Sequence, residues 1–125
     1  MIKGLGIDVQ SIDRTSKLID KYGELLINKV YTKLEWEQAN AAILLPKSKL
    51  FALMFSFKES AVKAIGSGFN GFEFYEVEIT GNIFQPKIYF RSNVYNKYER
   101  EKIKKIHSNG TTTESIVFTQ VILEG

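Results

Sequence analysis

Residues 51 to 68 contain the feature that most constrains the fold, a helical segment that is apolar over most of its surface. Its apolar residues recur at helical spacing and are Phe51, Met54, Phe55, Phe57, Ala61, Val62, Ala64 and Ile65. Such a helix leaves little surface for water and belongs in the middle of a domain. The glycine-rich turn of residues 66–68 is expected to end it and to let a backbone approach closely.

The same segment has two charges of opposite sign. Glu59 stands four residues before Lys63, which is the order that favours an ion pair on one helix face. A carboxylate and an ammonium beside a glycine turn on a buried helix make a candidate site. The alternative interpretation is an ordinary ion pair at a solvated edge, worth a few tenths of a kcal/mol.

The composition is that of a globular protein, and we expect residues 1–125 to form a single domain. Hydrophobic residues make up 44% and charged residues 25% of the 125 residues. Cysteine is absent, which excludes disulfides and thiolate metal sites and favours a reducing compartment. No apolar run approaches the ~18 residues of a membrane span. We therefore expect a cytoplasmic protein without a membrane partner. Its net charge of +3 suits an acidic or phosphate-bearing partner.

The first segment, Ile2 to Val9, alternates in polarity as a strand does. One face has Leu5, Ile7 and Val9, and the other has Gly4, Gly6 and Asp8. The nearly bare second face invites close contact, and Asp8 projects beside it. The two glycines are not a dinucleotide fingerprint, because the third glycine position falls at Val9 and the pair lies within the strand.

Helix signals follow this strand, and the period then changes to that of strands. Ser11 is a plausible N-cap, Gly23 a break, and Thr32 with Glu35 a capping box for a helix over 33–44 that Pro46 stops. A hairpin is expected from about residue 75 to residue 90 with its turn at 81–82, and a short helix is expected after Ser92. The turn at 109–110 should precede a final strand over 116–123. The order predicts an α+β fold with an antiparallel sheet packed on the central buried helix.

Three stretches together resemble one family, the holo-acyl-carrier-protein synthases, which are small 4′-phosphopantetheinyl transferases. They are Gly-Leu-Gly-Ile-Asp at 4–8, Phe-Ser-Phe-Lys-Glu-Ser-Ala-Val-Lys-Ala-Ile-Gly-Ser-Gly at 55–68, and Val-Phe-Thr-Gln-Val-Ile-Leu-Glu at the end. The spacing of the central stretch is specific, whereas the first would be weak alone. The resemblance implies the 4′-phosphopantetheinyl transferase fold. It also implies transfer of phosphopantetheine from coenzyme A to a serine of apo-acyl carrier protein, with Mg²⁺ required and 3′,5′-ADP released.

The resemblance also implies roles for individual residues. Asp8 and Glu59 would bind Mg²⁺ with the coenzyme A phosphates, and Lys63 would contact those phosphates. Phosphoryl transfer needs such a metal clamp, a neighbouring cation and an oriented hydroxyl. Glu59 or a metal-bound water could accept the serine proton. By the resemblance, the coenzyme A pocket would include Gly66, Ser67, Gly68, Pro86 and His107, Arg14 would dock the carrier protein, and the protein would be a homotrimer with active sites between subunits.

The chain departs from the family pattern in two places. Met54 stands where the family has an arginine, which removes one expected phosphate contact unless Lys47 or Lys49 replaces it. After His107, a second family histidine is missing, and an isolated histidine is more often structural or exposed than catalytic.

Three hypotheses follow. The first is the transferase, with no nucleic-acid partner. The second is a basic nucleic-acid-binding module that uses lysines and exposed aromatic residues such as Tyr95 and Tyr98. The third is a degenerate family member that binds coenzyme A or a carrier without turnover.

Overall fold

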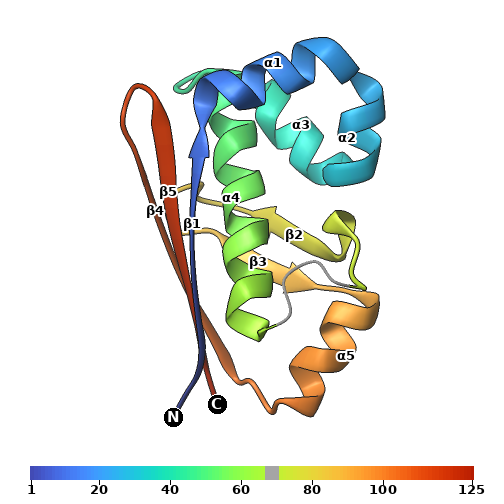
Figure 1. Ribbon diagram of the computed structural model, residues 1–125, viewed down its shortest axis with the longest axis vertical. Coiled ribbons are helices and arrows are strands. Elements are labelled where there is room, and N and C mark those ends of the chain that lie inside the picture. The colour runs from blue at the N-terminus through green and yellow to red at the C-terminus, as the bar shows by residue number, and fades with distance from the viewer. Residues whose placement is uncertain (67–70) are drawn as a thin grey trace.

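The computed structural model describes residues 1–66 and 71–125, in which two antiparallel sheets lie around one long helix (Figure 1). The elements are β1 (Ile2–Ser11), α1 (Ile12–Tyr22), α2 (Glu24–Val30), α3 (Lys33–Ala41), α4 (Lys47–Ile65), β2 (Val77–Thr80), β3 (Lys87–Phe90), α5 (Ser92–Arg100), β4 (Lys105–Thr112) and β5 (Ile116–Glu124). The predicted α+β class and the central position of the helix are confirmed. No helix within these two ranges combines the length and the apolar character that crossing a membrane requires.

Helix α4 is the centre of the hydrophobic core. Its residues Ala52, Leu53, Phe57, Ala61 and Val62 are fully buried, and the core cluster joins it to residues of both sheets and of α3 and α5. The helix begins after Pro46 and ends at Gly66, whose φ of 101° is left-handed. A left-handed residue after a helix favours glycine, so the predicted end of the helix is confirmed.

The three-stranded sheet has the order β1-β5-β4 and packs one face on α4. Gly4 and Gly6 allow this contact, because a Cβ atom at either position would lie within 2 Å of a carbonyl oxygen of α4, that of Ala64 or that of Ser60. The bare face predicted for β1 therefore faces the helix. The opposite face of β1 exposes its apolar residues Leu5, Ile7 and Val9.

Helices α1 to α3 cover one end of α4 (Figure 1). Ser11 Oγ accepts a hydrogen bond from the backbone N–H of Arg14, as predicted for an N-cap, and Gly23 separates α1 from α2. The capping box of Thr32 and Glu35 is confirmed, but α3 ends at Ala41 rather than near residue 44. Proline disfavours helical geometry in the residue before it, and the chain leaves the helix several residues before Pro46.

Two predicted turn or cap signals are wrong. Asn109 and Gly110 lie inside β4, and the β4–β5 turn lies at residues 113–115. Gly110 is instead a packing glycine, because a Cβ atom there would come within 2.7 Å of the Phe57 ring.

Ser92 does not cap α5 with its side chain. The Glu76 carboxylate accepts from the N–H of Asn93 at 2.7 Å in its place. The hairpin of β2 and β3 is confirmed, preceded by a 3₁₀ turn over Phe74–Glu76.

Candidate active site

Strand β1 and helix α4 bring Asp8 and Lys63 into direct contact. Lys63 Nζ lies 2.9 Å from Asp8 Oδ1 and 3.2 Å from the carbonyl oxygen of Ile7. The Asp8 side chain is 8% exposed, whereas that of Lys63 is 47% exposed. The lysine thus reaches over the edge of the helix from solvent and neutralises a nearly buried carboxylate.

Glu59 lies close enough to Asp8 for the two negative charges to interact. Burial raises the pKa of Glu59, the charge of Asp8 raises it further, and Lys63 lowers it. The ion pair of Lys63 is with Asp8, so the pair expected between Glu59 and Lys63 is not the one that forms. All three residues converge, as the motifs predicted, but the lysine bridges to the strand and leaves Glu59 as a half-buried, partly uncompensated carboxylate.

Gln10 is a member of this site that the sequence analysis missed. Its side-chain Nε2 donates to Asp8 Oδ2 at 2.8 Å, so both oxygens of Asp8 have a partner. Residues two apart in a strand face the same way, so the alternation that placed Asp8 beside the glycine face could also have identified Gln10.

The donor set of Asp8 and Glu59 fits a hard divalent cation. Mg²⁺ prefers oxygen ligands and is commonly bound by one or two carboxylates, with water and substrate phosphates completing the shell. The described residues contain no cluster of three or more His, Cys, Asp or Glu side chains placed to hold a metal ion. Among the described side chains, Asp8 and Glu59 are therefore the pair that would provide carboxylate ligands to such a site.

A cavity of about 410 Å³ lies against Glu59. Its wall includes Gln10 from β1, Arg14 and Leu18 from α1, and Phe55 from α4. Arg14 and the two other basic residues of α1, Lys17 and Lys21, are exposed. The candidate docking residue thus borders the same cavity as a candidate metal ligand.

Lys58 has a different position from its neighbours in sequence. Its side chain is fully buried and lies 2.8 Å from the equally buried Glu35, and it also donates to the carbonyl oxygens of Phe74 and Val77. Lys58 therefore does not share a solvated face with Glu59 and Lys63. Lys58 ties α4 to α3 and to the start of β2.

Of the remaining predicted coenzyme A residues, Pro86 and His107 are separated from Asp8 within this chain. Gly66 ends α4 near Lys63, and Ser67 and Gly68 lie outside the described residues. Pro86 is buried before β3, where its carbonyl oxygen accepts from Ser108 at 2.7 Å. His107 lies on the outer face of the sheet, 3.0 Å from Glu124. Asp8 is on the face that packs on α4, so one copy of the chain does not bring His107 to it.

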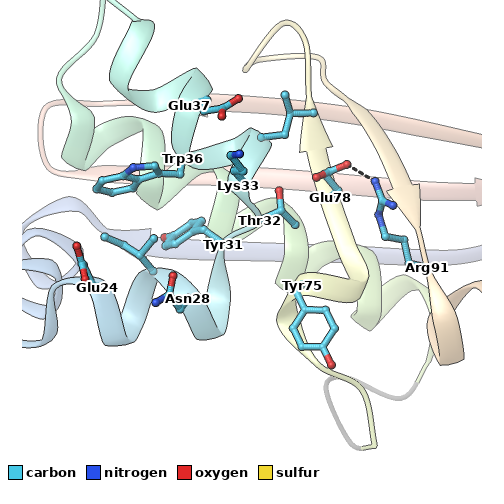
Figure 2. A pocket seen from close by; sticks show the side chains of 12 residues that line it. Glu24, Asn28, Tyr31, Thr32, Lys33, Trp36, Glu37, Tyr75, Glu78 and Arg91 are labelled. Atoms are coloured by element: carbon cyan, nitrogen blue, oxygen red, sulfur yellow. Dashed lines mark hydrogen bonds and ion pairs between the residues drawn. The ribbon is translucent and has the colours of Figure 1, made fainter.

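A larger cavity, of about 1030 Å³, contains none of the predicted residues. It lies between α2, α3 and the hairpin, and Figure 2 shows Tyr31 and Trp36 on one side and Glu78 with Arg91 on the other. Arg91 pairs with Glu78 at 2.6 Å. The buried carboxylate of Glu78 already has an ion-pair partner. This cavity is therefore a weaker candidate for the active site than the smaller cavity beside Glu59.

Met54 lines a third cavity, of about 730 Å³, between α3, α4 and the β2–β3 turn. It is 2% exposed. None of the residues that line this cavity is charged. Met54 is thus buried beside a cavity that neither Lys47 nor Lys49 lines, so replacement of the arginine by one of these lysines stays a prediction.

Comparisons with known proteins agree on one family. The model of the 4′-phosphopantetheinyl transferase superfamily matches residues 4–110. A holo-[acyl-carrier-protein] synthase of Maridesulfovibrio salexigens is 35% identical over 126 residues, covering 99% of each chain. The structure of holo-[acyl-carrier-protein] synthase from Neisseria meningitidis matches with a TM-score of 0.88 at 24% identity, covering 100% of each chain.

A further structure is similar in fold and was solved with a ligand. It is the holo-[acyl-carrier-protein] synthase of Helicobacter pylori in complex with coenzyme A, with a TM-score of 0.81 at 20% identity over 96% of this chain and 99% of that one. The fold, the family model and the full-length relative all lead to the same conclusion. The chain belongs to the 4′-phosphopantetheinyl transferase superfamily, as its two motifs predicted.

Proposed function

We propose that this protein transfers the 4′-phosphopantetheine group of coenzyme A to a serine of an apo-acyl carrier protein, releasing 3′,5′-ADP. The observation that supports this most is the convergence of Asp8 from β1 with Glu59 and Lys63 from α4, in a chain that belongs to the superfamily. We propose further that residues 1–125 act as a single transferase domain.

In this reaction the serine oxygen forms a bond to the β-phosphorus of coenzyme A, and the bond from that phosphorus to the leaving 3′,5′-ADP breaks. Asp8 and Glu59 would hold Mg²⁺, which when bound neutralises charge on the pyrophosphate. Lys63 would move from Asp8 to the phosphates, a short displacement for a flexible and half-exposed side chain. Glu59 or a water bound to Mg²⁺ would accept the serine proton.

Coenzyme A would lie along the end of α4, against Gly66, Ser67 and Gly68. We propose that Pro86 and His107 contact it from a neighbouring copy, in a homotrimer with active sites between subunits. The exposed apolar outer face of the three-stranded sheet supports this assembly. It includes Leu5, Ile7, Val9, Ile116 and Phe118, each between 37% and 57% exposed.

The acyl carrier protein would dock on α1 at Arg14, beside the cavity that borders Glu59. The carrier would be of fatty-acid or polyketide type. The absence of cysteine is in keeping with a cytoplasmic enzyme. Membership of the superfamily favours this function over the nucleic-acid-binding hypothesis.

The decisive experiment incubates purified protein with coenzyme A, Mg²⁺ and an apo-acyl carrier protein and measures the intact mass of the carrier. We expect a gain of one phosphopantetheine. Asp8→Asn and Glu59→Gln should abolish the gain, and Glu101→Gln, which replaces a carboxylate just after α5, should not. Calorimetric binding of coenzyme A without transfer to any carrier of the same organism would instead establish the degenerate member.

The assembly has a separate test. Light scattering of the purified protein should give the mass of a trimer, and Ile7→Asp should lower it. If sites lie between subunits, mixing inactive Glu59→Gln protein with inactive His107→Ala protein should restore part of the activity, because some mixed sites combine two intact halves. Absence of any restoration after subunit exchange would contradict shared sites.

A further inference from the structure

Three hydroxyl groups are buried between α4 and the three-stranded sheet, directly behind the candidate active site. Ser56, Ser60 and Thr119 are all fully buried. The two serine Oγ atoms each lie 2.7 Å from Thr119 Oγ1. Ser56 Oγ also donates to the main-chain oxygen of Asp8 at 3.3 Å, and Ser60 Oγ to that of Thr119 at 3.3 Å.

The three hydroxyl protons suffice for a directed chain of hydrogen bonds. A hydroxyl group donates one hydrogen bond and accepts others, so Ser60 can donate to Thr119, Thr119 to Ser56, and Ser56 to the carbonyl oxygen of Asp8. Each bond in this arrangement polarises the next, which strengthens such chains in a buried environment. The chain ends on the backbone of Asp8.

The position of these hydroxyls links the two strands and the helix that carry the candidate site. Thr119 pairs with Asp8 in the β1–β5 register. Ser56 and Ser60 lie on α4 on either side of Glu59 in sequence, one turn apart. Hydrogen bonds between them therefore connect the backbone that carries Asp8 to the helix that carries Glu59 and Lys63.

The hydrogen bonds between these hydroxyls can hold the strand and the helix in place against the repulsion between the two carboxylates. Two carboxylates that lie near each other repel, and burial increases the repulsion. Apolar packing resists a displacement of strand against helix only weakly, because it has little directional preference, whereas hydrogen bonds specify distance and direction. The closeness of Gly6 to the carbonyl oxygen of Ser60 prevents inward movement, and the hydroxyl network opposes movement outward or along the helix.

We infer that Ser56, Ser60 and Thr119 are positioning residues that set the separation of the Asp8 and Glu59 carboxylates for a divalent cation. The inference rests on the proposed function, in which those carboxylates hold the metal. The hydroxyls do not touch the cation or the substrate. They act through the backbone of Asp8 and through the placement of α4.

The test uses direct binding of Mn²⁺, which like Mg²⁺ prefers carboxylate and water ligands. Electron paramagnetic resonance measures free Mn²⁺ in the purified full-length protein without coenzyme A or carrier. Thr119→Val removes one hydroxyl at nearly constant volume and should weaken Mn²⁺ binding about tenfold, in the range that supporting hydrogen bonds show in metal sites. Thr119→Ser keeps the hydroxyl, and its affinity for Mn²⁺ should therefore be within about twofold of that of the parent protein.

Two further variants keep the inference falsifiable if Thr119→Val does not fold. Ser60→Ala removes a single oxygen and should weaken Mn²⁺ binding about threefold. The effect is smaller than that of Thr119→Val because Thr119 keeps Ser56 as a partner. Val94→Ala, a core substitution in α5 with a fully buried parent side chain, should lower stability to urea and leave Mn²⁺ affinity unchanged.

The outcomes separate this inference from the proposed function. If the parent binds Mn²⁺ through Asp8 and Glu59, and Thr119→Val and Ser60→Ala bind it equally well, the positioning role is wrong and the metal site stands. If the parent shows no Mn²⁺ binding that Asp8→Asn and Glu59→Gln abolish, both alone and with 3′,5′-ADP added to draw Lys63 from Asp8, the metal site is wrong and the inference falls with it.

Discussion

Lys63 Nζ lies 2.9 Å from Asp8 Oδ1, so the cation that the motif places on α4 binds the carboxylate of the strand. In this arrangement the lysine occupies an oxygen that a metal ion would use. Under the proposed function we expect an exchange, in which anionic phosphates draw Lys63 away and leave Asp8 free for a divalent cation.

Replacing Lys63 by methionine should have opposite effects on metal binding and on catalysis. Removal of a positive charge beside two carboxylates should tighten Mn²⁺ binding several-fold in the absence of coenzyme A. The same substitution should slow phosphopantetheine transfer about 100-fold or more, because a charge that stabilises the transferred phosphate is lost. Electron paramagnetic resonance and intact-mass kinetics measure the two effects. Lys97→Met on α5 is the matched control, and equal loss of both properties in Lys63→Met would contradict the exchange.

Glu59 should reduce the stability of the metal-free protein near neutral pH. Because burial raises the pKa of Glu59 above its usual value of 4.5, the folded state binds this proton more tightly than the unfolded state does. The stabilising contribution is complete below pH 4.5 and is lost as the pH rises through the raised pKa. In urea unfolding with a chelator, Glu59→Gln should be more stable than the parent at pH 7, and the difference should vanish below about pH 4.5. A less stable variant at pH 7 would contradict this.

The buried pair of Lys58 and Glu35 should be strongly coupled. Burial raises the pKa of Glu35 and lowers that of Lys58, so a partner left alone would be an uncompensated buried charge. Lys58→Met should cost about 3 to 5 kcal/mol, and adding Glu35→Gln, which removes the charge but keeps an oxygen that can accept from a backbone N–H, should recover part of that loss. The exposed pair of Lys17 and Asp13, at 2.9 Å, is the control. Its coupling in a double-mutant cycle should be far smaller, and similar couplings for both pairs would refute the argument from burial.

A methyl group at Gly6 should separate β1 from α4. The added Cβ would lie 1.9 Å from the carbonyl oxygen of Ser60, and backbone cannot give way as a flexible side chain can. We expect Gly6→Ala to cost about 3 kcal/mol of stability and to weaken Mn²⁺ binding. Gly23→Ala is the comparison, because a Cβ there meets nothing within 4 Å. It should cost about 2 kcal/mol from backbone strain alone, because a φ of 51° with a ψ of −127° is a sparsely populated conformation for a residue with a Cβ atom. Urea denaturation decides the order, and a smaller loss in Gly6→Ala than in Gly23→Ala would contradict the close packing.

Arg14 should act mainly on the encounter with the carrier protein. Lys17 is already paired with Asp13 at 2.9 Å, which leaves Arg14 and Lys21 as the basic residues of α1 without an ion pair to a described residue. Arg14→Glu should lower kcat/KM for the carrier about tenfold at low salt, and the loss should shrink as salt is added, because screening weakens attraction between exposed charges. The rate at saturating carrier should change little. Lys97→Glu is the control, and a salt-independent loss would argue against electrostatic docking.

Much of the local structure was predictable from the sequence, because its signals are local. The cap at Ser11, the capping box of Thr32 and Glu35, and the end of α4 at Gly66 each depend on hydrogen bonds within a few residues. The apolar spacing of α4 placed it in the core before any partner was known. The motifs also predicted that Asp8 lies close to Glu59 and Lys63, from which it is far apart along the chain.

Only the tertiary structure decided what each of these residues contacts. Gly110 resembles a turn residue locally, yet it lies under the Phe57 ring within β4. Lys58 and Lys63 are both lysines of one motif, and only packing makes the first a buried tie to Glu35 and the second a partner of Asp8. Helical periodicity shows which face of α4 is apolar, but a hydroxyl such as Ser60 has a defined role only when a distant strand brings Thr119 to it. The sequence alone thus determined which residues form the helix and the site, and long-range packing determined how they are paired, because contacts across distant segments leave no local pattern.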